Sequence, residues 1–184
     1  NVLVEMCQSE NVRGSLAGNI GIPFSSSVLE EMKSPMPKTV YVLEISSFQM
    51  EFIHHFHPKI AVYINISPDH LNRHGTMDKY IAMKMRMVEN QTKKDLVVYN
   101  MDDPLLTMAL KDHPATMAPF SMVRADMTFR LQTNSIYGTN GSLLIAVQDL
   151  ILPGRHNLSN ILAASTTAHL MGISDQRIAK IMGS

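Results

Sequence analysis

Short apolar runs separated by polar turns dominate the first hundred residues. Residues 39–43 are β-branched and aromatic without any charge, and residues 60–66 and 95–100 form two further runs of similar character. Such runs are typical of strands covered on both faces by helices. Residues 77–93 carry a helical pattern between the last two runs. This alternation predicts an α/β fold with βαβ units and a mostly parallel sheet flanked by helices.

The second half of the chain has a different pattern. Residues 128–133 alternate between apolar and polar, residues 137–142 (YGTNGS) contain an Asn-Gly pair, and residues 143–152 are again apolar. These features predict a small antiparallel β meander beside the parallel sheet. An Ala-rich helix should follow, with Asn157 as its N-cap and Gly172 as its stop.

The two ends of the chain also have recognisable patterns. Residues 1–8 are expected to be the tail of a helix, residues 12–16 a short strand, and residues 23–37 a short polar helix and loop. A further helical pattern covers residues 175–182, and the first residue is not methionine. We therefore expect one domain that is truncated at both ends.

Composition limits the classes of partner. A length of 184 residues suits one domain with a sizeable core. The formal net charge is zero and no basic block accumulates, so nucleic acid is not an expected partner. The single Cys7 cannot form an internal disulfide, and no apolar run approaches the roughly 20 residues that span a bilayer. The expectation is a cytoplasmic protein without membrane insertion.

Candidate chemistry lies where the strands end. Glu44 follows the first run and His70 follows the second. Ligands bind at the carboxyl edge of open α/β sheets, so these two side chains are candidates for one crevice, although an isolated acid there often just meets solvent. Lys84 lies in an apolar stripe of the expected helix. It either extends its ammonium to water or is partly buried with a lowered pKa.

Two other groups of residues have simpler interpretations. His54, His55 and His57 lack a matching Cys or acid spacing and are interpreted as surface histidines rather than a metal cluster. Gly18 and Gly21, on either side of Asn19, are interpreted as turn residues that supply unusual φ values.

Three blocks, LEISSFQME, NISPDHLNRHG and YIAMKMRMVEN, resemble the central domain of the Mur ligases. The resemblance extends from Gly18 to Gly172. The Ser-Ser-Phe-Gln sequence after Glu44 favours the branch of the family that adds D-glutamate. The resemblance implies a fold of the P-loop type, with residues 1–184 forming the central ATP-binding domain. It also implies ATP and Mg²⁺ as cofactors.

The resemblance implies a role for each matching residue. Glu44, His70 and Lys84 would be the catalytic and metal-binding group, with Lys84 carbamylated so that it offers oxygen ligands. Substrate contacts would come from Asn19, Ser46 and Gln49. His156, Asn157 and Asn160 match a segment that borders the adenine of ATP.

The implied reaction is ATP-dependent amide bond formation between UDP-N-acetylmuramoyl-L-alanine and D-glutamate, through an acyl phosphate, in bacterial peptidoglycan precursor synthesis. Two departures from the family pattern stand out. Asn72 occupies a position that is usually acidic, and no GxxxxGK[ST] phosphate loop occurs, since no Gly precedes a Lys. The chain as given is therefore expected not to turn over.

Two alternatives remain open. One is another Mur-type amide ligase such as folylpolyglutamate synthase, which would not be expected to carry SSFQ behind Glu44. The other is a non-catalytic nucleotide-binding module on the same fold, because a fold alone does not fix a function. The combination of Glu44, His70 and Lys84 argues against this second alternative.

Overall fold

The computed structural model describes residues 2–35, 38–152 and 154–184. Its N-terminal part consists of α1 (Val2–Cys7), β1 (Arg13–Gly18), α2 (Phe24–Lys33), β2 (Thr39–Glu44) and a 3₁₀ turn, η1 (Gln49–Phe52). The helix tail, strand and polar helix expected in this part are confirmed over the described residues, and the predictions for residues 1, 36 and 37 lie outside them.

The middle of the chain alternates strands and helices. It contains β3 (Ile60–Tyr63), α3 (Leu71–His74), α4 (Met77–Met85), η2 (Arg86–Val88), β4 (Leu96–Asn100), α5 (Pro104–Ala109) and β5 (Thr116–Phe120). The C-terminal part contains β6 (Arg130–Gln132), β7 (Ser135–Tyr137), β8 (Leu143–Ala146), η3 (Val147–Asp149), α6 (Arg155–Leu170) and α7 (Asp175–Met182).

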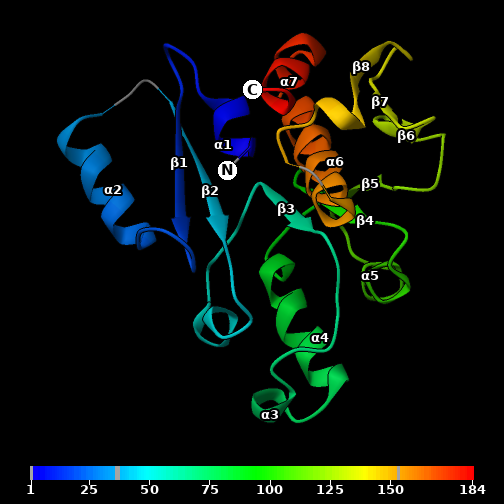
Figure 1. Cartoon of the computed structure of the whole chain (residues 1–184). Coiled ribbons are helices and arrows are strands. Elements are labelled where there is room, and N and C mark those ends of the chain that lie inside the picture. Colours follow the sequence, from blue (N-terminus) through cyan, green and yellow to red (C-terminus); the bar gives the residue numbers. More distant parts are fainter. Residues whose placement is uncertain (1, 36–37, 153) are drawn as a thin grey trace.

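The strands form three sheets (Figure 1). β1 and β2 pair in parallel, β3, β4 and β5 form a parallel sheet in that order, and β6, β7 and β8 form the antiparallel meander. The predicted α/β class, with parallel strands and a meander, is confirmed. β2 and β3 belong to different hydrogen-bonded sheets.

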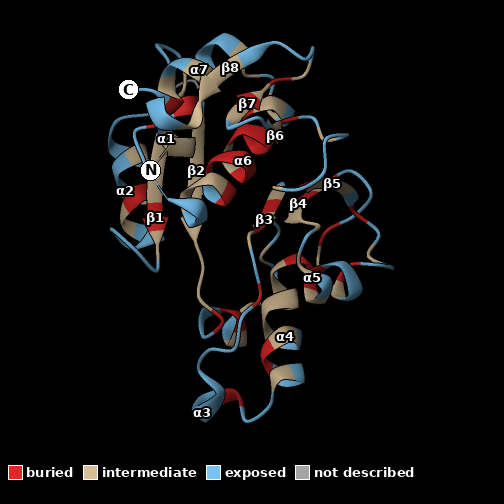
Figure 2. Ribbon diagram, turned by 45° about the vertical axis from the view of Figure 1, so that its right-hand side comes forward, coloured by how far each residue is buried: buried red, intermediate tan, exposed pale blue. Residues whose placement is uncertain are grey.

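Alternating side chains of the β3–β4–β5 sheet enter two hydrophobic cores. Ala61, Tyr63 and Val97 belong to a core with residues of α4 and α5, whereas Val98 and Phe120 belong to a core with α6, α7 and the meander. This alternation follows from the two-residue period of a strand. The sheet is thus covered on both faces, and α6 is the most buried helix (Figure 2).

Three sequence predictions were wrong in detail. β2 was expected to be buried, but all six of its residues are partly exposed, and within the described residues it pairs only with β1. The helix expected to reach residue 93 ends at Met85, and one 3₁₀ turn follows. Asn157 is not the N-cap of α6. Gly154 has that position with φ 108°, and no side chain caps the helix there.

Two other predictions agree with the structure to the residue. α7 has the predicted bounds, and Gly172 ends the preceding helix region with φ 83°. The sequence interpretation missed α5, β5 and the tight turn at Thr133 and Asn134, whose φ values of 48° and 58° join β6 to β7.

Candidate functional site

The loop after β1 is tied to the backbone of Glu44. Gly18 pairs with Glu44 in the parallel register, and the Asn19 amide donates to the Glu44 carbonyl at 2.8 Å. Gly18 has φ 116°, and a Cβ there would overlap the Glu44 carbonyl oxygen. Only glycine fits such a position. The predicted turn roles of Gly18 and Gly21 (φ 85°) are confirmed, and Asn19 is held next to Glu44.

The side chain of Glu44 has an unusual environment. Its Oε2 atom is buried and accepts no hydrogen bond from any residue that the structure describes. Buried carboxylate oxygens are normally paired, because leaving one without a donor or a cation is costly. The Oε2 atom of Glu44, at the end of β2, is therefore left without a donor from the described residues, and its predicted role as a metal ligand stays a prediction.

The Ser-Ser-Phe-Gln sequence forms a capping box. The Gln49 amide donates to Ser46 Oγ at 3.4 Å, while Gln49 Oε1 accepts from the Ser46 amide at 2.9 Å. This reciprocal pairing closes the turn at Ser47 and Phe48 that leads into η1, whose own N-cap, Phe48, has no side-chain cap bond. Ser46 and Gln49 thus have a structural role, and their predicted contact with substrate stays a prediction.

His70 lies close to the same loop. Its ring centroid is 4.8 Å from that of Phe48, and its Nε2 is 3.4 Å from Asp69 Oδ2. The His70 backbone is left-handed, with φ 50° and ψ 30°. A non-glycine residue in this conformation carries strain, which is concentrated at functional sites. The histidine is held in a specific place rather than in a relaxed loop.

A second histidine, His74, connects this loop to α4. Its Nε2 and Ser47 Oγ are 3.0 Å apart, and its ring stacks on Phe48 with centroids 5.6 Å apart and an interplanar angle of 11°. The centroid of the Tyr80 ring is 5.3 Å from that of His74. His74 and Ser47 are 8% and 5% exposed, so the hydrogen bond between them is shielded from water.

Lys84 is the next member of this series of contacts. Its Nζ lies 5.3 Å from the centroid of the Tyr80 ring, a cation–π distance, and its carbonyl accepts from the Tyr63 hydroxyl at 2.9 Å. Burial raises the pKa of Tyr63, so this hydroxyl stays protonated as a donor. Contacts thus connect Lys84 through Tyr80 and His74 to Phe48. Direct convergence of Glu44, His70 and Lys84 stays a prediction.

Two arginines bond to the segment that follows Glu44. The guanidinium of Arg86 donates to the carbonyls of Met50, Glu51 and Ile53 at 2.5, 3.0 and 2.7 Å. Arg73 pairs with the Glu51 carboxylate at 2.8 Å. The segment after Glu44 is therefore fastened to the elements that carry His70 and Lys84.

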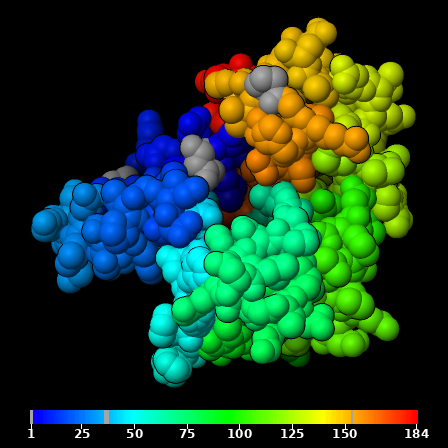
Figure 3. Space-filling view, turned by 60° about the horizontal axis from the view of Figure 1, so that its bottom comes forward, coloured from blue at the N-terminus to red at the C-terminus, as the bar shows by residue number. Residues whose placement is uncertain are grey.

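The start of α6 carries the candidate adenine contacts. Asn160 Nδ2 donates to Asn157 Oδ1 at 3.4 Å, so the two amides face each other, and His156 is exposed beside them. The first turn of α6 points to the same side of the molecule as the carboxyl ends of β1 and β2 (Figure 1). Seen from that side, the surface is hollowed between the N-terminal segments, α6 and the region after β3 (Figure 3).

An apolar cavity adjoins this edge. It has a volume of about 290 Å³ and lies between Gly18, Leu43 and Gln49, with Phe24 and Phe56 also in its wall. Residues 2–35, 38–152 and 154–184 contain no cluster of three or more His, Cys, Asp or Glu side chains that could hold a metal. Glu44 and His70 would therefore need additional oxygen ligands from a modified lysine, substrate or water.

Sequence reasoning missed the residues that assemble this edge. His74, Ser47 and Arg86 were not singled out, although the four-residue spacing of His70 and His74 is a signal of one helix face. His54 and His55 are exposed as predicted, with ring centroids 6.5 Å apart. His57 is also on the surface, but it binds Asp95 at 2.7 Å.

Comparisons with known proteins identify the family of the chain. Residues 12–168 match the model of the Mur ligase middle domain, and the chain belongs to this family. It is 35% identical over its whole length to UDP-N-acetylmuramoylalanine--D-glutamate ligase of Halalkalibacterium halodurans, and 41% identical over 94% of its length to the protein of that name from Caldanaerobacter subterraneus subsp. tengcongensis. The chain spans 40% and 38% of those two proteins.

Solved structures show the same fold. MurF from Acinetobacter baumannii superimposes with a TM-score of 0.71 at 16% identity, covering 100% of this chain and 42% of that one. The UDP-N-acetylmuramoyl-L-alanyl-D-glutamate--2,6-diaminopimelate ligase gives 0.71 at 20% identity, covering 99% and 42%. No helix among the described residues is long and apolar enough to cross a bilayer.

Proposed function

We propose that this chain is the central ATP-binding domain of a bacterial cytoplasmic ligase that joins D-glutamate to UDP-N-acetylmuramoyl-L-alanine. In the proposed reaction, ATP phosphorylates the carboxylate of the UDP-sugar substrate to an acyl phosphate. The amine of D-glutamate then attacks the acyl carbon, and phosphate leaves from the tetrahedral intermediate. The chain is 35% and 41% identical, over 100% and 94% of its length, to proteins named UDP-N-acetylmuramoylalanine--D-glutamate ligase. This similarity supports the choice of these substrates over those of other Mur-type ligases.

The observation that carries the proposal is the buried Oε2 of Glu44, which lacks a partner among the described residues. A carboxylate oxygen is the donor that Mg²⁺ prefers, so the residue fits the ion. When bound, Mg²⁺ would neutralise charge on the phosphates during transfer. Glu44 and His70 would hold it, with the strained His70 backbone keeping the imidazole in place.

The proposed role of Lys84 also fits its surroundings. Its ammonium lies over the Tyr80 ring, and the residue is half-buried. Carbamylation would convert this cation into an anionic oxygen ligand. Glu44 and His70 alone would offer a metal few ligands, so an additional oxygen ligand is needed at this edge. Tyr63 fixes the Lys84 backbone, so the side chain starts from a defined position.

The proposed adenine site uses the paired amides of α6. An amide offers both a donor and an acceptor, which matches the edge of adenine. Asn160 and Asn157 face each other at the first turns of α6, and His156 is exposed next to them. Asn19, whose amide is bonded to the Glu44 carbonyl, would contact the UDP-sugar.

A turnover assay tests the proposal. The full-length protein that contains this chain should release phosphate from ATP and Mg²⁺ only when UDP-N-acetylmuramoyl-L-alanine and D-glutamate are both present. Residues 1–184 alone should release none, because the chain has no phosphate loop to align the phosphates.

Two outcomes would favour other functions. Turnover with a folate and glutamate instead of the UDP-sugar would identify a folylpolyglutamate synthase. Tight ATP binding without turnover on either acceptor pair would indicate a non-catalytic nucleotide-binding module.

A further inference from the structure

We propose that His74 is a positioning residue for the metal site, acting through Ser47 and Phe48 to fix the loop that follows Glu44 against the elements that carry His70 and Lys84. The inference rests on the proposed function, because the catalytic part of its test measures the activity of the proposed ligase. It goes further by assigning a task to a histidine that would not itself touch metal, ATP or substrate.

The first step is the burial of His74. It lies at the end of α3 and is 8% exposed, unlike the neighbouring His70, whose side chain is 47% exposed. A buried imidazole is polar and costs free energy unless its nitrogens are paired. The Ser47 hydroxyl, itself 5% exposed, satisfies Nε2 at 3.0 Å, and either group can donate.

The second step is the arrangement of rings. Phe48 contacts both histidines, with His70 tilted at 4.8 Å and His74 stacked at 5.6 Å. Tyr80 contacts the ring of His74 and lies under the ammonium of Lys84. His74 is therefore the common neighbour of the loop after Glu44 and of the aromatic ring that supports Lys84.

The third step is the chemistry of the site. Glu44 lies at the end of β2, whereas the two residues proposed to share the metal with it, His70 and Lys84, lie at the start of α3 and on α4. The relative position of the three residues therefore depends on side-chain contacts between these elements. Mutation of residues that orient metal ligands without binding the metal themselves typically changes metal affinity or activity by about 10–100-fold.

Two variants of the full-length enzyme separate the hydrogen bond from the ring. His74→Phe keeps an aromatic ring between Phe48 and Tyr80 but cannot bond Ser47, and Ser47→Ala removes the same bond from the other side. Each should raise the Mg²⁺ concentration for half-maximal rate, or lower kcat, by about tenfold or more, with the KM for ATP little changed. The double variant should be no worse than the poorer single variant, because both remove one interaction.

A readout that does not depend on activity completes the test. Mn²⁺ binding, followed by the relaxation of water protons, should weaken in both variants by a similar factor. His113→Gln is the matched control, because the His113 ring also bonds within the fold, to the Val88 carbonyl at 3.1 Å, yet among the described residues it makes no hydrogen bond or ring contact with the loop after Glu44. It should change the melting temperature without changing Mn²⁺ affinity.

The possible outcomes are distinct. Folded variants with a lower melting temperature but unaltered Mn²⁺ affinity and Mg²⁺ requirement would show that His74 only stabilises the fold. If His74→Phe does not fold, Ser47→Ala, which deletes a single hydroxyl, decides the question by the same two readouts. A wild-type enzyme that binds Mn²⁺ but does not ligate D-glutamate would overturn the proposed function and leave the positioning role testable by Mn²⁺ affinity.

Discussion

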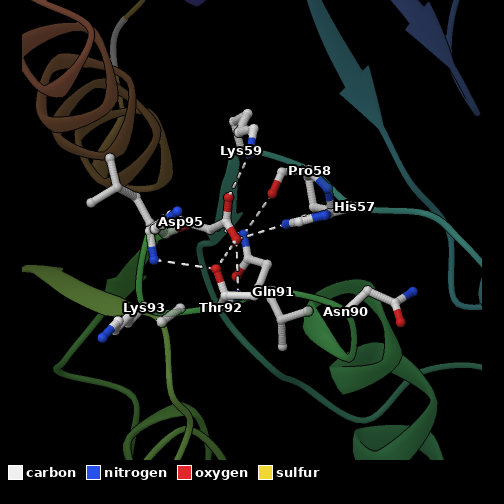
Figure 4. Close-up of polar contacts among 12 residues, drawn as sticks. His57, Pro58, Lys59, Asn90, Gln91, Thr92, Lys93 and Asp95 are labelled. Atoms are coloured by element: carbon white, nitrogen blue, oxygen red, sulfur yellow. Dashed lines mark hydrogen bonds and ion pairs between the residues drawn. The ribbon is translucent and has the colours of Figure 1, made fainter.

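Two histidine-containing sites lie at opposite ends of the central strands. They differ in how completely their buried carboxylate is hydrogen-bonded. At the carboxyl edge, the Oε2 of Glu44 is buried without a partner among the described residues. At the amino end of β4, the carboxylate of Asp95 is fully enclosed and accepts bonds from His57, Lys59 and Thr92 (Figure 4). We refer to Asp95 with these three partners as the Asp95 cluster.

The difference indicates which site has capacity for a ligand. The Asp95 carboxylate receives four hydrogen bonds, so its charge is satisfied by the protein itself and it fastens the start of β3 to the start of β4. Glu44 keeps a buried Oε2 that has no hydrogen-bond partner among the described residues. Structural sites complete their own bonding, whereas sites that bind cations leave part of it to the ligand.

The largest effect is expected from Glu44→Gln in the full-length enzyme. Loss of the charge that holds Mg²⁺ should lower kcat by about 100-fold or more. The melting temperature should stay the same or rise, because a buried unpaired carboxylate is replaced by a neutral amide. Activity assays and thermal unfolding of the same preparation measure both. A loss of stability with full activity would reverse the roles assigned to the two sites.

A comparable loss is expected for Lys84→Ala. If the lysine acts as a carbamate, high bicarbonate or a short-chain carboxylic acid should restore part of the activity by filling the space with oxygen ligands. Lys79→Ala, an exposed lysine on the same helix, is the control and should remain active. Unchanged activity of Lys84→Ala would mean that the side chain only extends over Tyr80 towards water.

A smaller effect is expected at the adenine end. Asn160→Ala should raise the KM for ATP by up to about a hundredfold, which corresponds to the loss of one or two hydrogen bonds worth about 0.5–3 kcal/mol in all. Since Asn160 is exposed, the melting temperature should change little. An unaltered KM with lower stability would assign Asn160 to the helix end alone.

Several features of this edge were predictable from sequence for physical reasons. Uncharged β-branched runs identify strands, and residues directly after them, such as Glu44, lie at the carboxyl edge wherever the strands are parallel. β5 was missed because it contains Pro119 and few β-branched residues. Proline is tolerated in an edge strand, where one side makes no ladder bonds, and β5 lies at the edge of its sheet.

The missed site residues depend on long-range contacts. His74 bonds Ser47 across 27 positions of the sequence, and Arg86 bonds Met50 across 36. No local sequence pattern therefore predicts either pairing. Asn157 had a local signal for an N-cap, but the positive φ of Gly154 starts α6 three residues earlier. Local rules thus place elements, while tertiary contacts decide which polar side chains meet.

Stability at acid pH tests the other side of the comparison. The hydrogen bond from His57, followed by that from the Thr92 amide, holds the pKa of Asp95 well below its usual range. The unfolded chain binds a proton near the ordinary value of about 3.9, whereas the folded protein does so only at lower pH. The free energy of unfolding should therefore fall as the pH drops below about 5, and Asp95→Asn should flatten this fall.

Urea unfolding between about pH 3 and pH 6 measures this dependence. Asp95→Asn should also lower the melting temperature at neutral pH, because the amide cannot match all four donors, while kcat at a temperature where the protein is folded stays near that of the wild type. Asp112→Asn, at an exposed aspartate, serves as the control. An equal acid slope in wild type and Asp95→Asn would exclude Asp95 as its source.

The smallest effect is expected at the capping box, where two interpretations of Ser46 and Gln49 can be separated. Ser46→Ala removes the hydroxyl that accepts from the Gln49 amide in the turn before η1, and it should cost about 0.5–2 kcal/mol of stability, as the loss of a capping oxygen does. Ser46→Asp keeps a capping oxygen and should restore most of that stability, since aspartate is also a favoured N-cap. If capping is the only role of Ser46, the KM for the UDP-sugar stays the same in both variants. If Ser46 also contacts the anionic substrate, Ser46→Asp raises that KM despite its restored stability, because the new carboxylate repels the substrate, and the predicted substrate role stands.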